Sequence, residues 1–118
     1  MIAGELYCPG DPELVRDRAR NQELQRRYNA TIVSDKVERR SILAEWLGGI
    51  GTGTELRAPL YTDYGYNTFL GRDCFTNHGV ILLDVCEIHI GDMTQIGPQV
   101  QILTADHPRE AAARDAGL

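Results

Sequence analysis

Residues 90–101 read IGDMTQIGPQVQ, two six-residue units that follow one another without a gap. An aliphatic residue and a glycine open each unit, and a small or β-branched residue takes the fifth place. The same form occurs at residues 70–75, LGRDCF, and more loosely at residues 64–69, YGYNTF. Repetition at a fixed short period indicates an architecture built from stacked units.

Two weaker units lie between the clear ones. TNHGVI at 76–81 and LLDVCE at 82–87 keep the six-residue phase from Leu70, and the phase slips by two residues before Ile90. Such repeats are typical of a left-handed parallel β-helix, in which each unit supplies one short strand and one turn, and three units make a triangular coil. The aliphatic residue points inward, and glycine tolerates the adjoining turn. We predict coils of this kind over residues 54–106.

The fifth residue of each unit is expected to face inward at a corner of the coil. This position is occupied by Cys74, Val80, Cys86, Thr94 and Val100. Both cysteines are therefore interpreted as small core residues and not as a metal pair or reactive thiols. His and Cys do not cluster elsewhere in the sequence, so we predict no metal site.

Residues 1–53 predict helices instead. Asp11-Pro12 is a typical helix start, and good helix formers continue to about Tyr28. A second helix is expected from Ser34 or Asp35, with Glu38 in capping-box spacing to Asp35. Its apolar stripe is predicted to be a core face and consists of Val37, Ile42, Leu43, Trp46 and Leu47. The predicted fold class is mainly β with an α-helical N-terminus: two helices, then a partial left-handed parallel β-helix of about two coils.

Composition narrows the possible partners. The 118 residues include 17 Asp+Glu against 12 Lys+Arg, which argues against nucleic acid because phosphate binding needs a basic face. No apolar run approaches the roughly 20 residues of a membrane helix, and the first ten residues lack the features of a secretory signal. Three cysteines without a CxxC pair fit reduced thiols. We predict a cytoplasmic protein with no membrane or nucleic-acid partner.

Several motifs in order along the chain carry a family resemblance: MIAGELY at 1–7, DPEL at 11–14, DYGYN at 63–67, ILLDVCEIHIGD at 81–92 and TADHP at 104–108. Together they resemble the maltose and galactoside O-acetyltransferases, which are hexapeptide-repeat acyltransferases. The resemblance implies a cytoplasmic homotrimer that uses acetyl-CoA as co-substrate and acetylates a small-molecule sugar acceptor such as maltose or glucose. It also implies that the helical segment, residues 1–53, helps to shape the sugar pocket.

The resemblance assigns roles to individual positions. His107 matches the catalytic histidine of the family, Asn77 matches an asparagine beside the acceptor and thioester, and Asp84 matches an aspartate that contacts the sugar. Asp63 lies where relatives have a sugar-contacting polar residue. There are also departures, since Phe75 replaces a tyrosine of galactoside-acetylating relatives and Pro9 falls on their N-terminal aspartate. Both departures weaken the case for a galactoside acceptor.

The chemistry explains why a histidine is expected. A sugar hydroxyl is a poor nucleophile near pH 7, so a base must remove its proton as it attacks the thioester carbonyl. Histidine has an ordinary pKa near neutrality, and we predict that His107 is this base in a direct transfer. From the residues alone, a histidine before proline such as His107 is more often a loop residue than a catalytic base, and Asn77 and Asp84 could be turn residues. The role of Asp63 is left open.

The family pattern continues beyond TADHP with an excursion loop, further coils and a closing segment. Residues 107–118 are interpreted as the start of that loop, at which the chain ends. Two hypotheses follow. The chain is either a sugar O-acetyltransferase or its front part, or it is a catalytically inactive truncated remnant or assembly piece. We expect the isolated chain to bind acetyl-CoA weakly or not at all.

Overall fold

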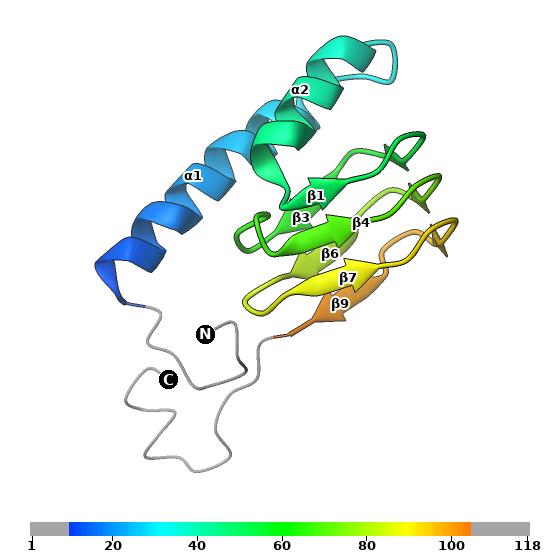
Figure 1. Cartoon of the computed structure of the whole chain (residues 1–118). Helices are drawn as coiled ribbons and strands as arrows, with labels where there is room; N and C mark the ends of the chain where they lie inside the picture. Colours follow the sequence, from blue (N-terminus) through cyan, green and yellow to red (C-terminus); the bar gives the residue numbers. More distant parts are fainter. Residues whose placement is uncertain (1–9, 105–118) are drawn as a thin grey trace.

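A computed structural model describes residues 10–104 of the chain. Two helices are followed by nine short strands in this part (Figure 1). The helices are α1 (Pro12–Asn29) and α2 (Lys36–Trp46). The strands are β1 (Gly49–Ile50), β2 (Glu55–Leu56), β3 (Leu60–Thr62), β4 (Thr68–Leu70), β5 (Phe75–Thr76), β6 (Val80–Leu83), β7 (Ile88–Ile90), β8 (Gln95–Ile96) and β9 (Gln101–Leu103). Neither helix is long and apolar enough to cross a membrane.

The strands form three parallel three-stranded sheets, with the orders β1-β4-β7, β2-β5-β8 and β3-β6-β9. Each coil therefore gives one strand to each face of a triangular prism, and the helices cover its first-coil end (Figure 1). This is the predicted left-handed parallel β-helix with two preceding helices, and that prediction is confirmed.

The described part contains three coils, one more than the sequence analysis counted. The first strand begins at Gly49, ahead of the boundary predicted at residue 54. The sequence did carry a signal, because IGTGTE at 50–55 has the hexapeptide form. The sequence analysis did not recognise this unit as part of a coil, because it directly follows the helical segment.

Each coil is twenty residues long, since Ile50 pairs with Leu70 and Leu70 pairs with Ile90. This is two residues more than three hexapeptides. The extra length lies where the chain passes from the β3-β6-β9 sheet to the β1-β4-β7 sheet, at residues 63–67 in the first coil and 84–87 in the second. We call these two stacked segments the long corner. The predicted two-residue slip before Ile90 is the long corner of the second coil.

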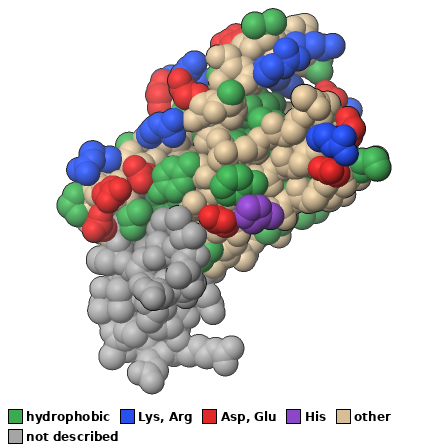
Figure 2. All heavy atoms as spheres, viewed as in Figure 1, with side chains coloured by type: hydrophobic (Ala, Val, Ile, Leu, Met, Phe, Trp, Pro, Cys, Tyr) green, Lys and Arg blue, Asp and Glu red, His purple; other side chains and the backbone are tan. Residues whose placement is uncertain are grey.

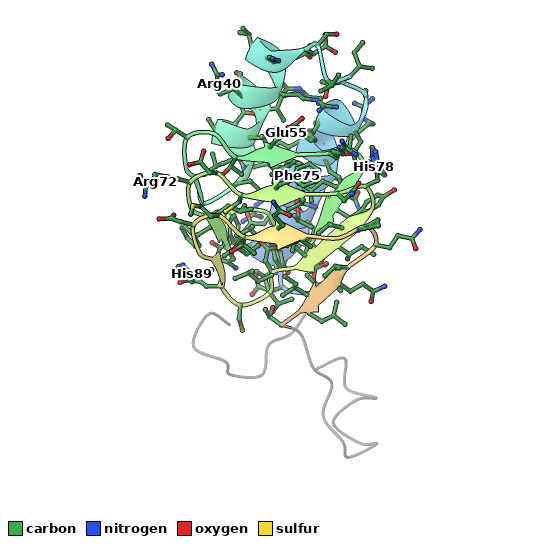
Figure 3. All side chains as sticks on the ribbon, turned by 90° about the vertical axis from the view of Figure 1, so that its right-hand side faces the viewer. Arg40, Glu55, Arg72, Phe75, His78 and His89 are labelled. Atoms are coloured by element: carbon green, nitrogen blue, oxygen red, sulfur yellow. The ribbon has the colours of Figure 1, made fainter. Side chains whose placement is uncertain are left out.

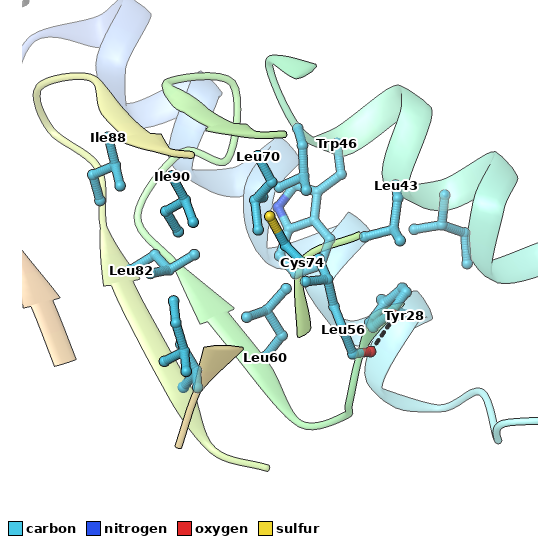
Figure 4. Close-up of a cluster of buried hydrophobic side chains, with 14 of the residues drawn as sticks. Tyr28, Leu43, Trp46, Leu56, Leu60, Leu70, Cys74, Leu82, Ile88 and Ile90 are labelled. Carbon is cyan, nitrogen blue, oxygen red and sulfur yellow. Dashed lines mark hydrogen bonds between the residues drawn. The ribbon is translucent and has the colours of Figure 1, made fainter. Parts of the chain in front are cut away.

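Inward side chains stack in columns along the prism (Figure 4). Three such columns are Ile50, Leu70 and Ile90; Leu56, Thr76 and Ile96; and Thr62, Leu82 and Ile102. Among the fifth-place residues, Cys74 and Val80 are buried as predicted. Cys86 and Thr94 are only partly buried, and Val100 is 38% exposed, so the prediction is wrong for Val100.

A buried polar network joins both helices to the first coil. The Trp46 Nε1–H donates to Asn21 Oδ1 at 2.8 Å and to Thr62 Oγ1 at 3.1 Å, and the Asn21 amide donates to the Thr62 carbonyl oxygen at 2.8 Å. Trp46 is fully buried. Gly65 packs against its ring so closely that a Cβ there would lie 2.4 Å from Trp46 Cδ1. Gly65 also has φ +82°, so only glycine suits this position.

The first helix forms much as the sequence predicts. The Asp11 carboxylate accepts a hydrogen bond from the Glu13 N–H at 2.9 Å, and α1 ends at Asn29, one residue after the predicted end. Leu24 and Tyr28 are both buried, and the Tyr28 hydroxyl donates to the Leu56 carbonyl oxygen at 2.5 Å (Figure 4). Lys, Arg, Asp and Glu side chains lie on the outer surface (Figure 2).

Two expectations for the second helix are wrong. Asp35 makes no side-chain bond to the start of α2, and its carboxylate accepts from the Ile32 N–H at 2.9 Å instead, closing the turn between the helices. Val37 is 80% exposed, because it lies in the first turn of α2, on the side away from the coils. The other stripe residues are buried, as predicted.

One interior threonine suggests a stabilising substitution. Thr76 is fully buried between Leu56 and Ile96, and its Oγ1 is the one buried side-chain polar atom in residues 10–104 without a hydrogen-bond partner. Valine has nearly the same shape and removes the unsatisfied hydroxyl. Thr76→Val is therefore expected to raise the free energy of unfolding in urea by about 1 kcal/mol.

Thr68 offers a matched control. It is equally buried, but its Oγ1 donates to Asp84 Oδ2 at 3.1 Å. Thr68→Val should therefore lower the free energy of unfolding by about 2 kcal/mol, the usual value for a hydrogen bond to a charged group. Equal effects of the two substitutions would show that the Thr76 hydroxyl is satisfied after all.

Candidate functional site

The long corner is organised around a buried carboxylate. Asp84 is 0% exposed, and its two carboxylate oxygens accept hydrogen bonds from four donors within residues 63–68. The donors are the backbone N–H groups of Asp63 (3.2 Å), Tyr64 (2.8 Å) and Asn67 (3.1 Å) and the Thr68 hydroxyl (3.1 Å). Asp84 thus fixes the backbone of residues 63–68. The sugar contact that the resemblance implies for Asp84 stays a prediction, because here its carboxylate faces the protein.

Asp63 differs from Asp84 in the burial and the hydrogen bonding of its carboxylate. It is half-buried, and its carboxylate forms no hydrogen bond with any residue of the described range 10–104. Burial raises its pKa above the ordinary value, and the charge of Asp84 raises it further, while Arg18 opposes both effects. A half-buried carboxylate with a free hydrogen-bonding capacity and a raised pKa is a common feature of binding sites. Asp63 therefore carries a carboxylate that no group within residues 10–104 satisfies by a hydrogen bond.

The first two turns of α1 lie beside the long corner and form hydrogen bonds with it. The Tyr66 hydroxyl donates to Asp17 Oδ2 at 2.8 Å, and Arg18 Nη1 donates to the Tyr64 hydroxyl at 3.2 Å. The rings of Tyr64 and Tyr66 stack with centroids 5.5 Å apart. Burial and the contact with Asp17 raise the pKa of Tyr66 far above its ordinary value, so its hydroxyl remains a donor.

Sequence reasoning missed Asp17, Arg18 and Tyr66 as neighbours of the candidate site. The two contacts join residues 49 and 46 positions apart. No local spacing could have revealed them, because they depend on the angle at which α1 lies across the coils.

Asn77 lies at a different corner, between β5 and β6. Its side-chain oxygen accepts from the His78 N–H at 2.8 Å and from Arg57 Nη1 at 3.5 Å. The four residues of β6 lie between this corner and Asp84, a separation of at least about 13 Å at 3.3 Å per residue. Figure 3 shows this corner through His78, opposite the side that carries Arg72 and His89. A single chain therefore does not bring Asn77 together with Asp63 and Asp84.

His107 lies outside the described residues, as does the expected loop at 107–118. The last described residue, Thr104, is held at the long corner of the third coil. Its N–H donates to the Leu83 carbonyl oxygen at 3.1 Å, and its hydroxyl accepts from the Cys86 N–H at 2.9 Å. The chain that leads to His107 is thus anchored directly next to the segment that contains Asp84.

Comparisons with known proteins agree with this architecture. The family model for the maltose acetyltransferase hexapeptide capping motif matches residues 1–51. A maltose O-acetyltransferase from Clostridium difficile superimposes with a TM-score of 0.95 at 37% identity, over 98% of this chain and 62% of that one. The chain is also 30% identical over 118 residues to the galactoside O-acetyltransferase of Escherichia coli, over 98% of this chain and 57% of that protein. Nodulation protein L of Rhizobium meliloti is 42% identical over 118 residues, which are all of this chain and 64% of the relative.

A further similar structure carries a ligand. The hexapeptide-repeat acetyltransferase VCA0836 of Vibrio cholerae, in complex with acetyl coenzyme A, superimposes with a TM-score of 0.88 at 29% identity. The match covers 98% of this chain and 62% of that chain. The chain thus spans less than two thirds of the length of each of these four relatives.

The raised pKa of Asp63 predicts a pH-dependent stability effect. A raised pKa means that the folded chain holds this proton more tightly than the unfolded chain does. The resulting stabilisation is complete below the ordinary pKa of 3.8 and is lost as the pH rises through the raised value. At pH 7 the native carboxylate is charged and partly desolvated, so Asp63→Asn should raise Tm. The gain should vanish near pH 3.

Asp92→Asn is the matched control for that experiment. The pKa of Asp92 is lowered, first by the hydrogen bond from the Arg72 N–H, which is 2.8 Å long. Its stabilisation is present above pH 3.8 and is lost as the pH falls. Asp92→Asn should therefore lower Tm at pH 7. A fall in Tm for Asp63→Asn as well would contradict the assignment of a desolvated, unsatisfied carboxylate.

Proposed function

We propose that this chain is the acceptor-binding part of a cytoplasmic sugar O-acetyltransferase, which moves an acetyl group from acetyl-CoA to a hydroxyl of a sugar such as maltose or glucose. The observation that carries the proposal is Asp63, a half-buried carboxylate without a hydrogen-bond partner in the described chain. Asp63 lies in the same long-corner segment as Tyr64 and Tyr66, which contact α1, and Thr104 is anchored to the next segment of that corner. The names of the relatives support acetyl transfer as the reaction class.

His107 is the general base in this proposal. Its imidazole removes the proton from the sugar hydroxyl as the oxygen attacks the thioester carbonyl carbon. A carbon–oxygen bond forms, the carbon–sulfur bond breaks, and the thiol leaves with a proton returned by the imidazolium. Backbone N–H donors that face the carbonyl oxygen would each contribute about 3 kcal/mol to stabilising the developing charge.

Asp63 and Asp84 have different tasks in the proposal. The free carboxylate of Asp63 accepts from acceptor hydroxyls and so orients the sugar, and the half-buried ring of Tyr66 offers an apolar surface beside it. Asp84 is a positioning residue, because its four hydrogen bonds hold the backbone on which Asp63 stands.

Asn77 requires a second copy of the chain. It lies at another corner, at least about 13 Å from Asp84 along β6. If Asn77 belongs to the same site as Asp63, the corner of one copy must meet the long corner of another. This is the reason to propose the homotrimer that the family resemblance implies, with sites between neighbouring copies.

The rival hypothesis is that the chain is an inactive remnant or assembly piece. Thiol release from acetyl-CoA, measured against maltose, glucose and a galactoside, separates the two hypotheses. For any longer form of the protein, the proposal expects transfer to maltose or glucose, with kcat lowered at least 100-fold by His107→Ala, the usual range for loss of a general base.

His89→Ala is the control for that assay. His89 is exposed, stacks on Phe69 and contacts Glu87, so its loss should leave transfer unchanged. Full turnover by the His107→Ala variant would show that His107 is not the general base. Absence of transfer together with absence of acetyl-CoA binding in calorimetry would favour the inactive chain.

Substitutions of the two aspartates are expected to have different effects, one on sugar binding and the other on stability. Asp63→Asn should raise the KM for the sugar about tenfold while the chain stays folded, since a single acceptor contact is lost. Asp84→Ala leaves four buried donors without an acceptor and should lower the free energy of unfolding by about 3 kcal/mol. Urea denaturation and initial rates distinguish the outcomes. An unchanged stability of Asp84→Ala would contradict the positioning role.

A further inference from the structure

A pocket of about 440 Å³ lies between α2 and the first turn of the β-helix, far from the long corner. Its apolar lining includes Leu43 from α2 and Ile50 and Leu56 from the first coil. Residues 51–54, which include two glycines, form the coil side and add no large side chain. The volume suits a small metabolite, and the lining suits one with an apolar body.

The rim of this pocket carries an excess of positive charge. Lys36, Arg39 and Arg40 line it against a single carboxylate, Glu55. Figure 3 shows Arg40 on α2 above the strand that carries Glu55. Three cations against one anion give a formal charge of +2 in a chain whose net charge is −5. The pocket is therefore a positive site on an acidic protein.

Two of these cations are free to meet a ligand. Lys36 and Arg40 form no hydrogen bond or ion pair within residues 10–104, whereas Arg26, Arg27 and Arg72 each pair with a carboxylate. Lys36 and Arg40 are four residues apart on α2, so they project from the same helix face.

The third cation is already oriented. Arg39 donates from Nε to Thr31 Oγ1 at 2.8 Å and from Nη2 to the Thr31 carbonyl oxygen at 3.2 Å. Its guanidinium also lies 5.3 Å from the centre of the Tyr28 ring. Ligand binding would therefore cost little side-chain entropy at Arg39.

We propose that this pocket binds a small organic phosphate with an apolar or aromatic body. A phosphate carries up to two negative charges and three acceptor oxygens, which matches two free cations on one helix face better than a single carboxylate does. The body lies on Leu43, Ile50 and Leu56. None of Asp63, Asn77 and Asp84 lines the pocket, so the site is separate from the proposed acceptor site.

Occupancy would join the helical segment to the first coil, because α2 supplies the cations and the coil supplies the opposite wall. A ligand that binds only the folded chain raises the thermal midpoint, and the rise grows with the logarithm of the ratio of ligand concentration to Kd. The pocket could thus serve as an effector site, whose ligand stabilises the helices that cover the end of the β-helix.

Calorimetry and thermal shift on the 118-residue chain test the proposal with three probes: phenyl phosphate, phenol and inorganic phosphate. Phenyl phosphate should bind at least tenfold more tightly than either fragment and should raise Tm. Lys36→Gln and Arg40→Gln should each weaken its binding about tenfold or more, the usual effect of losing a charge-assisted hydrogen bond. Both side chains are exposed, so these variants should keep the native circular dichroism spectrum.

Arg16→Gln is the matched control, since Arg16 is an exposed cation on α1 that does not line the pocket. It should leave the affinity for phenyl phosphate unchanged. The proposal fails if Arg16→Gln weakens binding as much as Arg40→Gln, because the attraction would then be diffuse. It also fails if phenol or inorganic phosphate alone binds as tightly as phenyl phosphate, or if no probe binds. None of these outcomes depends on acetyl transfer.

Discussion

One buried carboxylate fixes the geometry on which the rest of the candidate site depends. Asp84 is removed from water, and the hydrogen bonds of four donors within residues 63–68 offset that cost. The bonds run between successive coils, so they set both the path of residues 63–68 and the stacking of one coil on the next. Every contact that α1 makes with the long corner through Tyr64 and Tyr66 follows from that path.

The helices and the β-helix form one unit because polar and apolar contacts act together at their junction. Asn21, Trp46 and Thr62 satisfy one another inside an apolar surrounding, where an unsatisfied group would be costly. Gly65 brings the long corner against the Trp46 ring. The candidate acceptor site and the phosphate pocket both lie where a helix meets the first coil, and no residue of the long corner lines the pocket.

Hexapeptide spacing predicted the fold because the inward positions of each coil must be aliphatic or small, and that requirement is visible in residues such as Leu70, Ile90 and Cys74. Spacing did not predict the burial of Asp84, because an aspartate in a solvated turn and one that serves as a buried acceptor look alike in a sequence. The contacts of Asp17 and Arg18 were equally invisible, since they join distant segments. Asp63 was found through the family resemblance, and its free carboxylate through the structure.

The twenty-residue register has a consequence for how such proteins change during evolution. Each strand residue pairs with the residue twenty positions later, so successive coils place equivalent residues in the same column. Duplication or loss of a whole coil keeps every inward column in phase, whereas gain or loss of one residue inside a strand turns the side chains after it to the wrong face. Length should therefore vary by entire coils or at corners, and the corners are where new chemistry can be added without disturbing the columns.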